Sequence, residues 1–287
     1  MDEQTLVIDK IKSFELKDIF ECGQCFRWNK EQDGSYTGVV NNGVLNVKCD
    51  DKKIYFHGYL NCKIQDFVTT YFDMDRDYEK IKKELAKIDS NMKEATKYGQ
   101  GIRILNQDLW EMIISYIISA NNNIPRIKGI IEKISKQYGT KITFNGKDYY
   151  LFPTAIQLKD VTVEDFRALG TGFRDVRLYE TTKLVLNQTI NLENLKSLDT
   201  EEAKKELLKL SGVGPKVADC ILLFSTLKRF DIFPIDVWVR RVMNDLYIHA
   251  DEEQKVSKKL IGEIAYKKFG NYEGIAQQYL YYWKREN

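Results

Sequence analysis

The chain lacks long hydrophobic runs and any sign of a sorting segment. Its longest uncharged stretch, Met112–Pro125, is too short to span a bilayer and suits a buried helix. The first ten residues carry acidic side chains and no apolar core, so we expect no secretory signal. These absences predict an intracellular protein with no membrane partner.

Cysteine is scarce and shows no disulfide framework, since the five cysteines stand at positions 22, 25, 49, 62 and 220 of 287 residues. Cys22 and Cys25 have the spacing of a zinc or redox pair, but Cys49 and Cys62 do not form the second pair that zinc would need. Small buried residues are the stronger interpretation, and a metal or redox role is the alternative. The C-terminal half holds no four-cysteine cluster, so we expect no iron–sulfur centre.

The sequence also lacks a strong excess of charge of one sign. Lysine and arginine number 44 against 42 aspartates and glutamates, a net charge of +2. Global charge therefore gives weak support for nucleic-acid binding, and any grip on DNA must come from local clusters and backbone amides. The 17 Tyr, 14 Phe and 4 Trp residues are compatible with base stacking, although core packing accounts for most of them.

No repeat, low-complexity tract or long linker interrupts the chain, and residues 1 to about 90 favour strands. Asn41-Asn42-Gly43 and Asp50-Asp51 separate β-rich runs as hairpin turns would. We expect an antiparallel sheet with a helix packed on one face. The predicted strands are 26–28, 36–40, 44–47 and 54–56.

From about Asp77 onward the hydrophobic period is helical. Pro125 and Pro215 suit first helical turns, and Thr162 begins a capping-box pattern. Residues 140–160 look irregular, with a hairpin or turn at Asn145-Gly146, and glycines 139, 170, 212 and 270 suit helix ends. We predict an α+β fold in which an antiparallel sheet domain, 1–92, precedes a larger all-helical region, 93–287. The predicted helices are 77–88, 107–120, 124–138, 164–169, 174–187, 200–210, 215–227, 237–248, 255–269 and 272–285.

The richest chemical signal lies between residues 207 and 241. Ser211-Gly212-Val213-Gly214 can form a hairpin between two helices, at about 200–227, whose outward amides would bind an anion such as a DNA phosphate. Lys216 follows in the first turn of the next helix, where the helix dipole disfavours an ammonium, so we expect a lowered pKa. A neutral amine is a nucleophile for electrophilic carbon, as in Schiff-base chemistry.

Asp236 and Cys220 extend this signal, and each has a structural alternative. Asp236 precedes a helix as an N-cap would, which stabilises a helix by about 1 kcal/mol. As a functional carboxylate it could stabilise an oxocarbenium ion at a sugar C1′. Cys220 lies one turn from Lys216, where a thiol could tune the amine or only fill space. Lys216 itself could be a phosphate contact rather than a nucleophile.

The hairpin, Lys216 and the Pro-x-Asp ending at Asp236 resemble the helix-hairpin-helix DNA glycosylases. Further motifs narrow the resemblance to the 8-oxoguanine DNA glycosylase/lyases, and they occur in the same order along the chain from about residue 5 to 285. These motifs are Cys22–Trp28, Ala120–Arg126, Leu169–Arg174, Gly212–Cys220 and Gly274–Tyr281.

The resemblance implies a bifunctional enzyme of base excision repair that excises 8-oxoguanine paired with cytosine. Lys216 would attack C1′ of an everted nucleotide and form an imine, Asp236 would stabilise positive charge, and β-elimination would nick the strand. Its active site would lie in the cleft between helical subdomains. The base pocket would comprise the Gly23 carbonyl, which accepts from N7–H of the oxidised base, Gln277 at the Watson–Crick edge, and Tyr281 and Cys220 on the two ring faces.

The resemblance also implies contacts around the lesion. Asn121, Arg126 and Arg174 would contact the cytosine left behind, and Phe173 would wedge into the vacated stack. The DNA phosphates would lie against Gly212, Val213, Gly214 and Trp238. The partner would be double-stranded DNA, bound by a monomer with no required cofactor or metal and at most a structural cation at the hairpin. The compact length fits the cytoplasm or nucleoid of a prokaryote.

This chain departs from better-known eukaryotic members at four positions, where Cys25 replaces serine, Phe173 tyrosine, Trp238 histidine and Tyr281 phenylalanine. Two alternatives stay open. One is a sibling glycosylase for alkylated purines or oxidised pyrimidines, although the former usually lack the hairpin lysine and the latter usually carry an iron–sulfur cluster. The other is a non-catalytic helix-hairpin-helix DNA-binding protein.

Overall fold

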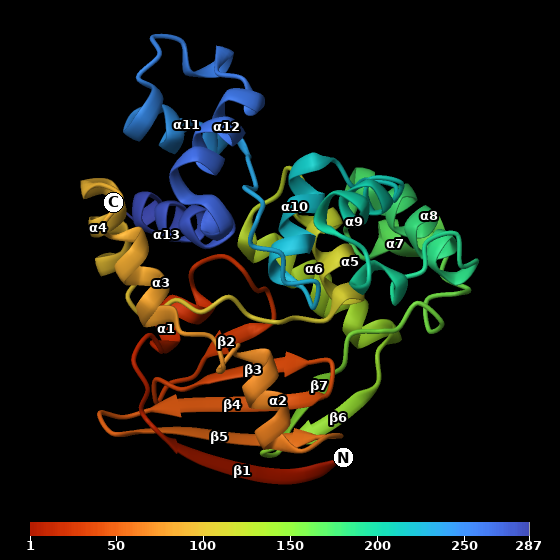
Figure 1. Ribbon diagram of the computed structural model, residues 1–287. Helices are drawn as coiled ribbons and strands as arrows, with labels where there is room; N and C mark the ends of the chain where they lie inside the picture. The colour runs from red at the N-terminus through yellow and green to blue at the C-terminus, as the bar shows by residue number, and fades with distance from the viewer. Residues whose placement is uncertain (287) are drawn as a thin grey trace.

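The N-terminal part of the chain forms the predicted antiparallel sheet, which has five strands because β1 (Asp2–Asp9) joins the four that were predicted (Figure 1). The computed structural model describes residues 1–286. Asn41 and Asn42 form the two-residue turn between β3 and β4, and Asp50 caps the turn before β5 by accepting from two backbone amides. The strands, in the spatial order β1-β5-β4-β3-β2, are β1 (Asp2–Asp9), β2 (Trp28–Lys30), β3 (Tyr36–Val40), β4 (Gly43–Cys49) and β5 (Lys53–Leu60).

Helices accompany this sheet, so the expectation of mostly strand over residues 1–90 is wrong in part. α1 (Leu16–Phe20) and α2 (Ile64–Tyr71) both belong to the sheet domain. Ile64 and Val68 of α2 share a buried cluster with Phe56 of the sheet, which confirms the predicted helix on one face. The remaining elements are helical, apart from a hairpin of β6 (Lys141–Phe144) and β7 (Lys147–Tyr150) that turns at Asn145-Gly146.

The predicted helices are present, with ends that differ by a few residues, and a further helix, α4 (Ser90–Tyr98), was not predicted. Pro125 and Pro215 lie in first helical turns, and Thr162 forms a complete capping box with Asp165. The predicted helix 237–248 ends at residue 243 and continues as a π-type turn over 244–248. The helices are α3 (Tyr78–Leu85), α4 (Ser90–Tyr98), α5 (Leu109–Ser119), α6 (Ile124–Tyr138), α7 (Val163–Ala168), α8 (Asp175–Leu186), α9 (Thr200–Leu207), α10 (Pro215–Phe224), α11 (Val237–Met243), α12 (Lys258–Phe269) and α13 (Glu273–Glu286).

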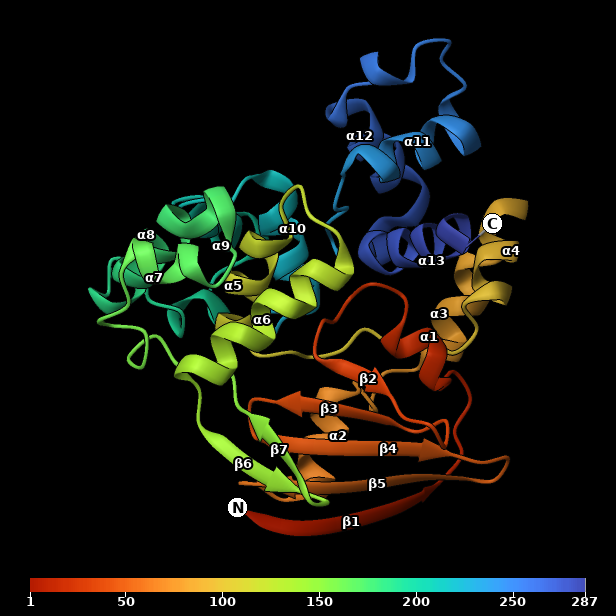
Figure 2. The same cartoon turned by 180° about the vertical axis from the view of Figure 1, so that it is seen from behind.

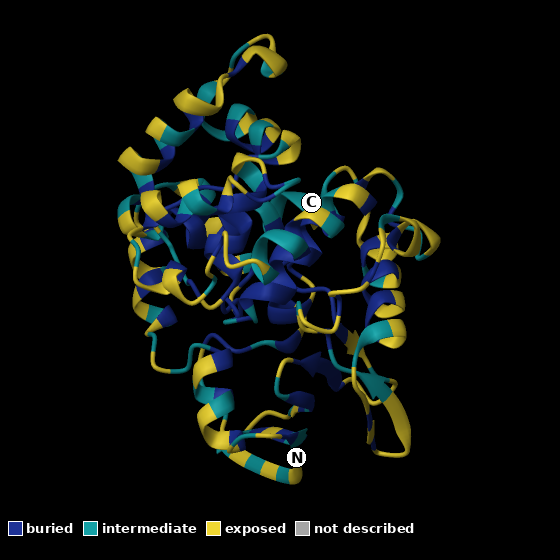
Figure 3. Cartoon of the chain, turned by 90° about the vertical axis from the view of Figure 1, so that its right-hand side faces the viewer, coloured by how far each residue is buried: buried dark blue, intermediate teal, exposed yellow. Residues whose placement is uncertain are grey.

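Figure 3 shows the buried residues gathered in the interior of the molecule, and helix α5 is buried along nearly all of its length. Its apolar run, Met112–Ile118, is buried on all sides, as the uncharged sequence predicts. Ile81, Leu85 and Met92 of α3 and α4 pack into this same core, and α4 lies beside α13 (Figures 1 and 2). The helical core therefore draws on both sides of residue 92, and that domain boundary stays a prediction. No helix among residues 1–286 is long and apolar enough to cross a membrane.

Candidate active site

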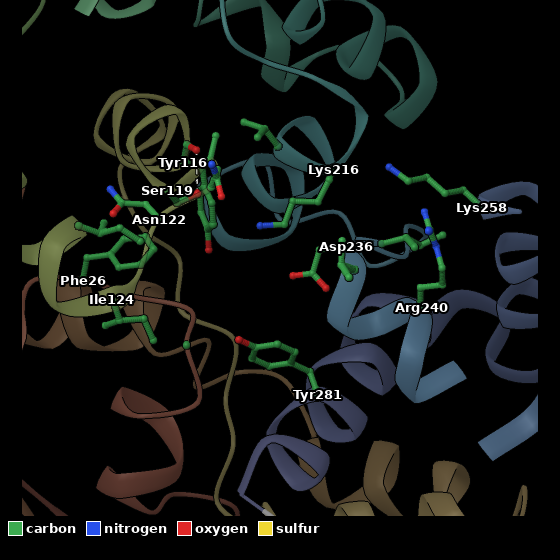
Figure 4. A pocket seen from close by; sticks show the side chains of 17 residues that line it. Phe26, Tyr116, Ser119, Asn122, Ile124, Lys216, Asp236, Arg240, Lys258 and Tyr281 are labelled. Carbon is green, nitrogen blue, oxygen red and sulfur yellow. Dashed lines mark hydrogen bonds between the residues drawn. The ribbon is translucent and has the colours of Figure 1, made fainter. Parts of the chain in front are cut away.

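A cavity of about 500 Å³ lies where the sheet domain's Gly23 loop meets the helices (Figure 4). Segments far apart in the sequence build its wall, because the loop after α1, the α5–α6 turn and the starts of α10 and α11 converge there. The lining includes Gly23, Phe26, Tyr116, Ser119, Asn121, Asn122, Ile124, Lys216, Asp236, Arg240, Lys258 and Tyr281.

Lys216 projects into this cavity from the first turn of α10 (Figure 4). Gly214 is the N-cap in an extended conformation and Pro215 is the first helical residue, so the chain enters the helix with Lys216 facing the cavity. The Lys216 Nζ atom lies 5.7 Å from the centroid of the Tyr116 ring. The amine thus lies beside an aromatic ring in a partly enclosed cavity.

The Lys216 pKa departs from its ordinary value in the direction opposite to the expected lowering. It is raised, with the charge of Cys220 as the largest cause and the Asp236 carboxylate as a further one, against the lowering effect of burial. The Cys220 charge acts only at a pH where that thiol ionises, so at neutral pH the Asp236 carboxylate is the negative charge beside the amine. Burial itself raises the pKa of the Cys220 thiol to about 11. At neutral pH the resting pair is therefore an ammonium beside a neutral thiol, and the amine must lose its proton before it can attack carbon.

Asp236 is the N-cap of α11 and also faces the cavity. Its Oδ1 accepts a hydrogen bond of 2.8 Å from the backbone N–H of Val239, which confirms the predicted cap. The same carboxylate points into the space that Lys216 occupies (Figure 4), and it contributes to the raised pKa of the amine. The cap and the site are therefore compatible uses of one side chain, as the sequence indicated.

A second, smaller cavity of about 60 Å³ adjoins the first one. Gly23, Lys216, Cys220, Gln277 and Tyr281 all contribute to its wall, so the structure brings the predicted pocket residues together. Gln277 is 6% exposed, and its Oε1 is buried without a hydrogen-bond partner among the described residues. A buried acceptor left unpaired costs about 1–3 kcal/mol, so this atom indicates a place where a donor binds.

The residues predicted to contact the opposite base lie around the α5–α6 turn. Asn121 and Arg126 are exposed, and Phe173 is 55% exposed, with the Arg174 guanidinium carbon 4.2 Å from its ring centroid. Arg174 is only 2% exposed and donates to the carbonyl oxygens of Ala120, Asn121 and Thr171. In this chain Arg174 thus fixes the turn that presents Asn121.

The hairpin between α9 and α10 places three predicted phosphate contacts together. Gly212 has a φ of +82°, the left-handed conformation that a glycine tolerates. The N–H of Val213 donates to the Leu210 carbonyl at 3.1 Å, so it closes the turn instead of pointing outward. The hairpin can offer an anion the amides of Gly212 and Gly214. Trp238 is exposed on α11, two residues after Asp236.

Two cations on the cavity wall were not found from the sequence. Arg240 of α11 and Lys258 of α12 lie on the side of the cavity opposite Phe26 and Ile124 (Figure 4). No motif marks them, although Arg240 follows Asp236 by four residues and so lies on the same helical face. Among residues 1–286 no group of three or more His, Cys, Asp or Glu side chains is arranged to hold a metal ion.

Comparisons with known proteins agree along the length of the chain. The family model of the N-terminal domain of 8-oxoguanine DNA glycosylase matches residues 6–113. The model of the HhH-GPD superfamily of base excision DNA repair proteins matches residues 114–265. Together they cover both the sheet domain and most of the helical region.

Individual relatives match most of the chain, and the match covers most of their own length. The crystal structure of Clostridium acetobutylicum 8-oxoguanine glycosylase/lyase in complex with double-stranded DNA containing cytosine opposite 8-oxoguanine is 43% identical, with a TM-score of 0.91 over 100% of this chain and 99% of that one. The probable N-glycosylase/DNA lyase of Methanothermobacter thermautotrophicus is 31% identical over 76% of this chain and 74% of that protein. The N-glycosylase/DNA lyase of Saccharomyces cerevisiae is 30% identical over 93% and 82%.

Proposed function

The chain belongs to the HhH-GPD superfamily of base excision DNA repair proteins and, within it, to the 8-oxoguanine DNA glycosylase/lyases, and we propose that Lys216 and Asp236 carry its reaction. It is a DNA N-glycosylase with lyase activity that excises 8-oxoguanine paired with cytosine from double-stranded DNA. The observation that supports these roles is that a lysine and a carboxylate enter one cavity beside an unpaired buried acceptor.

Lys216 is the nucleophile in this proposal. Its Nζ, once deprotonated, forms a bond to C1′ of the everted nucleotide while the bond from C1′ to the base breaks and its electron pair leaves with the base, which takes up a proton. Opening of the sugar ring then gives an imine between Nζ and C1′. Loss of a C2′ proton allows the C3′–O bond to break with the phosphate as leaving group, which nicks the strand.

Asp236 stabilises the positive charge that develops at C1′ as the base departs. A fixed carboxylate is effective here because the cavity is partly enclosed and its backbone cap already orients the side chain. The cap leaves the second carboxylate oxygen available to the cavity, and Lys216 shares that space (Figure 4). Charge stabilisation and helix capping are therefore parts of one arrangement.

The smaller cavity is the proposed base pocket, and it must widen before a purine can enter. Its volume of about 60 Å³ corresponds to roughly two water molecules. The Tyr281 ring lies against Gly23, so Tyr281 is the side chain that we expect to move and then stack on the base opposite Cys220. The Gly23 carbonyl would accept a hydrogen bond from the N7–H that distinguishes the oxidised base. Gln277 Oε1 would accept a hydrogen bond from a donor on the Watson–Crick edge of that base.

Arg126 is the proposed reader of the opposite cytosine that is easiest to test. Its guanidinium is exposed and makes only a 3.5 Å contact with the Gly170 carbonyl, so it can reach a base without breaking a strong bond. Arg126→Ala should reduce the preference for cytosine over the other three bases by roughly tenfold. An unchanged ranking, measured with four duplexes that differ only opposite the lesion, would remove this contact from the proposal.

DNA phosphates would be bound by the amides of Gly212 and Gly214, by Trp238, and by Arg240 and Lys258. We propose that a monomer acts in this way on the nucleoid DNA of a prokaryotic cytoplasm. The nucleophile and the charge stabiliser are both side chains, so the proposal needs no cofactor, and a structural cation at the hairpin carbonyls stays a prediction.

The proposal is tested by trapping the imine. Borohydride should link the wild-type chain to a duplex with 8-oxoguanine opposite cytosine, and Lys216→Gln should abolish the adduct. Lys209→Gln, an exposed lysine just before the hairpin, is the matched control and should trap fully. Full trapping by Lys216→Gln would refute the assignment of the nucleophile.

The same duplex on a gel, with and without alkali, separates base release from nicking. A lesion panel with alkylated purines and oxidised pyrimidines tests the sibling specificities. Tight binding of every duplex with no product would favour the non-catalytic alternative.

A further inference from the structure

Helix α13 holds the Gly23 loop at two carbonyl groups. Gln278 Nε2 donates to the Cys22 carbonyl at 2.6 Å, and Arg285 Nη2 donates to the Glu21 carbonyl at 2.5 Å. Tyr281 lies between these two side chains along the helix. The loop residues before Gly23 are therefore fixed by the same helix that carries the proposed stacking ring.

Gly23 itself fits closely between Arg285 and Tyr281. A Cβ atom built on Gly23 would lie 3.0 Å from Arg285 Nη1 and 3.3 Å from Tyr281 Cε1, and the φ of +93° favours glycine. The Arg285 guanidinium carbon lies 5.5 Å from the Tyr281 ring centroid. One guanidinium thus contacts both proposed recognition elements, the loop that presents a carbonyl and the ring that covers the base.

The bonds of Arg285 to the Glu21 carbonyl and the Glu286 carboxylate leave one end of its guanidinium unpaired. The Arg285 side chain is 22% exposed, and its Nη1 is buried with no hydrogen-bond partner among residues 1–286. An unpaired buried donor is costly, so packing and the Glu21 bond do not by themselves account for the Nη1 atom that lies against the Gly23 loop. The planar fork, by contrast, can bond the loop and lie by the ring at the same time.

We propose that Arg285 is a positioning residue for base recognition, which sets the distance between the Gly23 carbonyl and the Tyr281 ring. This inference depends on the proposed function, because it assigns Arg285 to the pocket that receives the oxidised purine. Arg285 does not line either cavity, so it acts through Gly23 and Tyr281 and touches neither Lys216 nor Asp236. Cleavage at a site that already lacks its base should therefore not depend on it.

This difference gives the test, which compares two substrates of one enzyme. Arg285→Ala should lower kcat/KM for an 8-oxoguanine–cytosine duplex by roughly ten- to a hundredfold, since a shift of about 1 Å in a positioned group can cost that much. Cleavage of a preformed abasic site should change by less than about threefold. Arg285→Lys, which keeps a cation without the fork, should lie between Arg285→Ala and wild type.

Lys284→Ala is the matched control, because it removes a cation from the neighbouring position, where Lys284 pairs with Asp245 and does not contact the loop. It should leave both activities unchanged. The ratio of the two activities in each preparation does not depend on the fraction folded, so a destabilised variant still gives an answer.

Each outcome separates this inference from the function on which it depends. Equal loss of both activities in Arg285→Ala, or loss of neither, would overturn the positioning role while the proposed substrate stands. A wild-type chain that cleaves abasic DNA but not 8-oxoguanine duplexes would overturn the substrate and this inference together. Selective loss of 8-oxoguanine excision supports both.

Discussion

The Asp236 carboxylate has two roles, the observed helix cap and the proposed charge stabilisation, and a single substitution can separate them. Asparagine is as good an N-cap as aspartate, so Asp236→Asn should keep the bond from Val239 N–H and change the melting temperature by no more than about 2 °C. Loss of the charge should reduce single-turnover excision by roughly 10²–10³-fold. Asp199→Asn, which changes the N-cap of α9, is the control and should keep full activity. Preserved turnover in Asp236→Asn would refute the catalytic role.

The protonation of Lys216 predicts how the rate depends on pH. The raised pKa means that the ammonium predominates at neutral pH, and only the small neutral fraction can attack C1′. The single-turnover rate should therefore rise with pH between about 6 and 9, with a slope near one on logarithmic axes. Abasic-site cleavage should show the same rise, because the same amine attacks there. A flat profile for both substrates would contradict proton loss from Lys216 as a requirement.

Local sequence identifies which residues enter the site but not how their neighbours tune them. The Gly214-Pro215 helix start places Lys216, and the N-cap pattern places Asp236, so both positions could be predicted. The direction of the Lys216 pKa could not, since it depends on Cys220 and Asp236 after folding. Burial lowers a lysine pKa elsewhere, to about 8 at Lys228, whose amine donates to the Ile104 carbonyl.

At the scale of elements, the hydrophobic pattern predicts the helices that are rich in apolar residues and misses elements that contain few of them. α5, α6 and α10 were predicted because each has an apolar face. β1 is an edge strand with every second residue exposed, and α4 is a mostly polar helix that packs on α13. Each carries only a short apolar signal, Leu6-Val7-Ile8 in β1 and Met92 with Ala95 in α4, and both pack on partners distant in the sequence. Arg240, Lys258 and Arg285 were not predicted either, because no local motif marks them and only folding brings them near the site.

The buried helix α5 carries a carboxyl group whose titration should affect stability. Burial raises the pKa of Glu111 to about 7, against the lowering effect of the Arg27 guanidinium. When the pKa of an acid is higher in the folded chain than in the unfolded chain, the folded state binds its proton more tightly. The protein then loses stability as the pH rises from the unfolded pKa through the folded pKa. Above about pH 7 the folded chain must therefore bury a carboxylate, and this part of its stability is lost.

Glu111→Gln removes that charge and should stabilise the chain in alkali. The gain in the free energy of unfolding should be small near about pH 5 and reach at most roughly 3 kcal/mol near about pH 8. Urea denaturation at the two pH values measures it. Glu263→Gln, an exposed glutamate on α12, is the control, and its effect should stay below about 0.5 kcal/mol at both values. A gain that does not grow with pH would show that Glu111 is not buried as a titrating group.

At the scale of the whole molecule, one buried glutamine joins the two cores beside the active site. Gln24 Nε2 donates to the carbonyls of Ile19 and Arg103, and its Oε1 accepts from the N–H of Leu105. Its own carbonyl accepts from Gln107, which also donates to Phe224 at the end of α10. These bonds connect the sheet domain with the segment before α5 and with the end of α10, next to Gly23. The position of the Gly23 carbonyl in the site therefore depends on this junction.

Gln24→Ala should show this coupling, because it leaves the Arg103 carbonyl and the Leu105 amide buried and unpaired. We expect a loss of roughly 2–4 kcal/mol in the free energy of unfolding, with far-UV circular dichroism and tryptophan fluorescence still changing together. Trp28 lies in the sheet core and Trp110 in the helical core, so fluorescence reports on both. Gln157→Ala, on the surface, should cost less than about 0.5 kcal/mol. Two separate transitions in the wild-type chain would show that the sheet domain unfolds alone, and the Gly23 carbonyl would then depend on the sheet domain's own stability rather than on the junction.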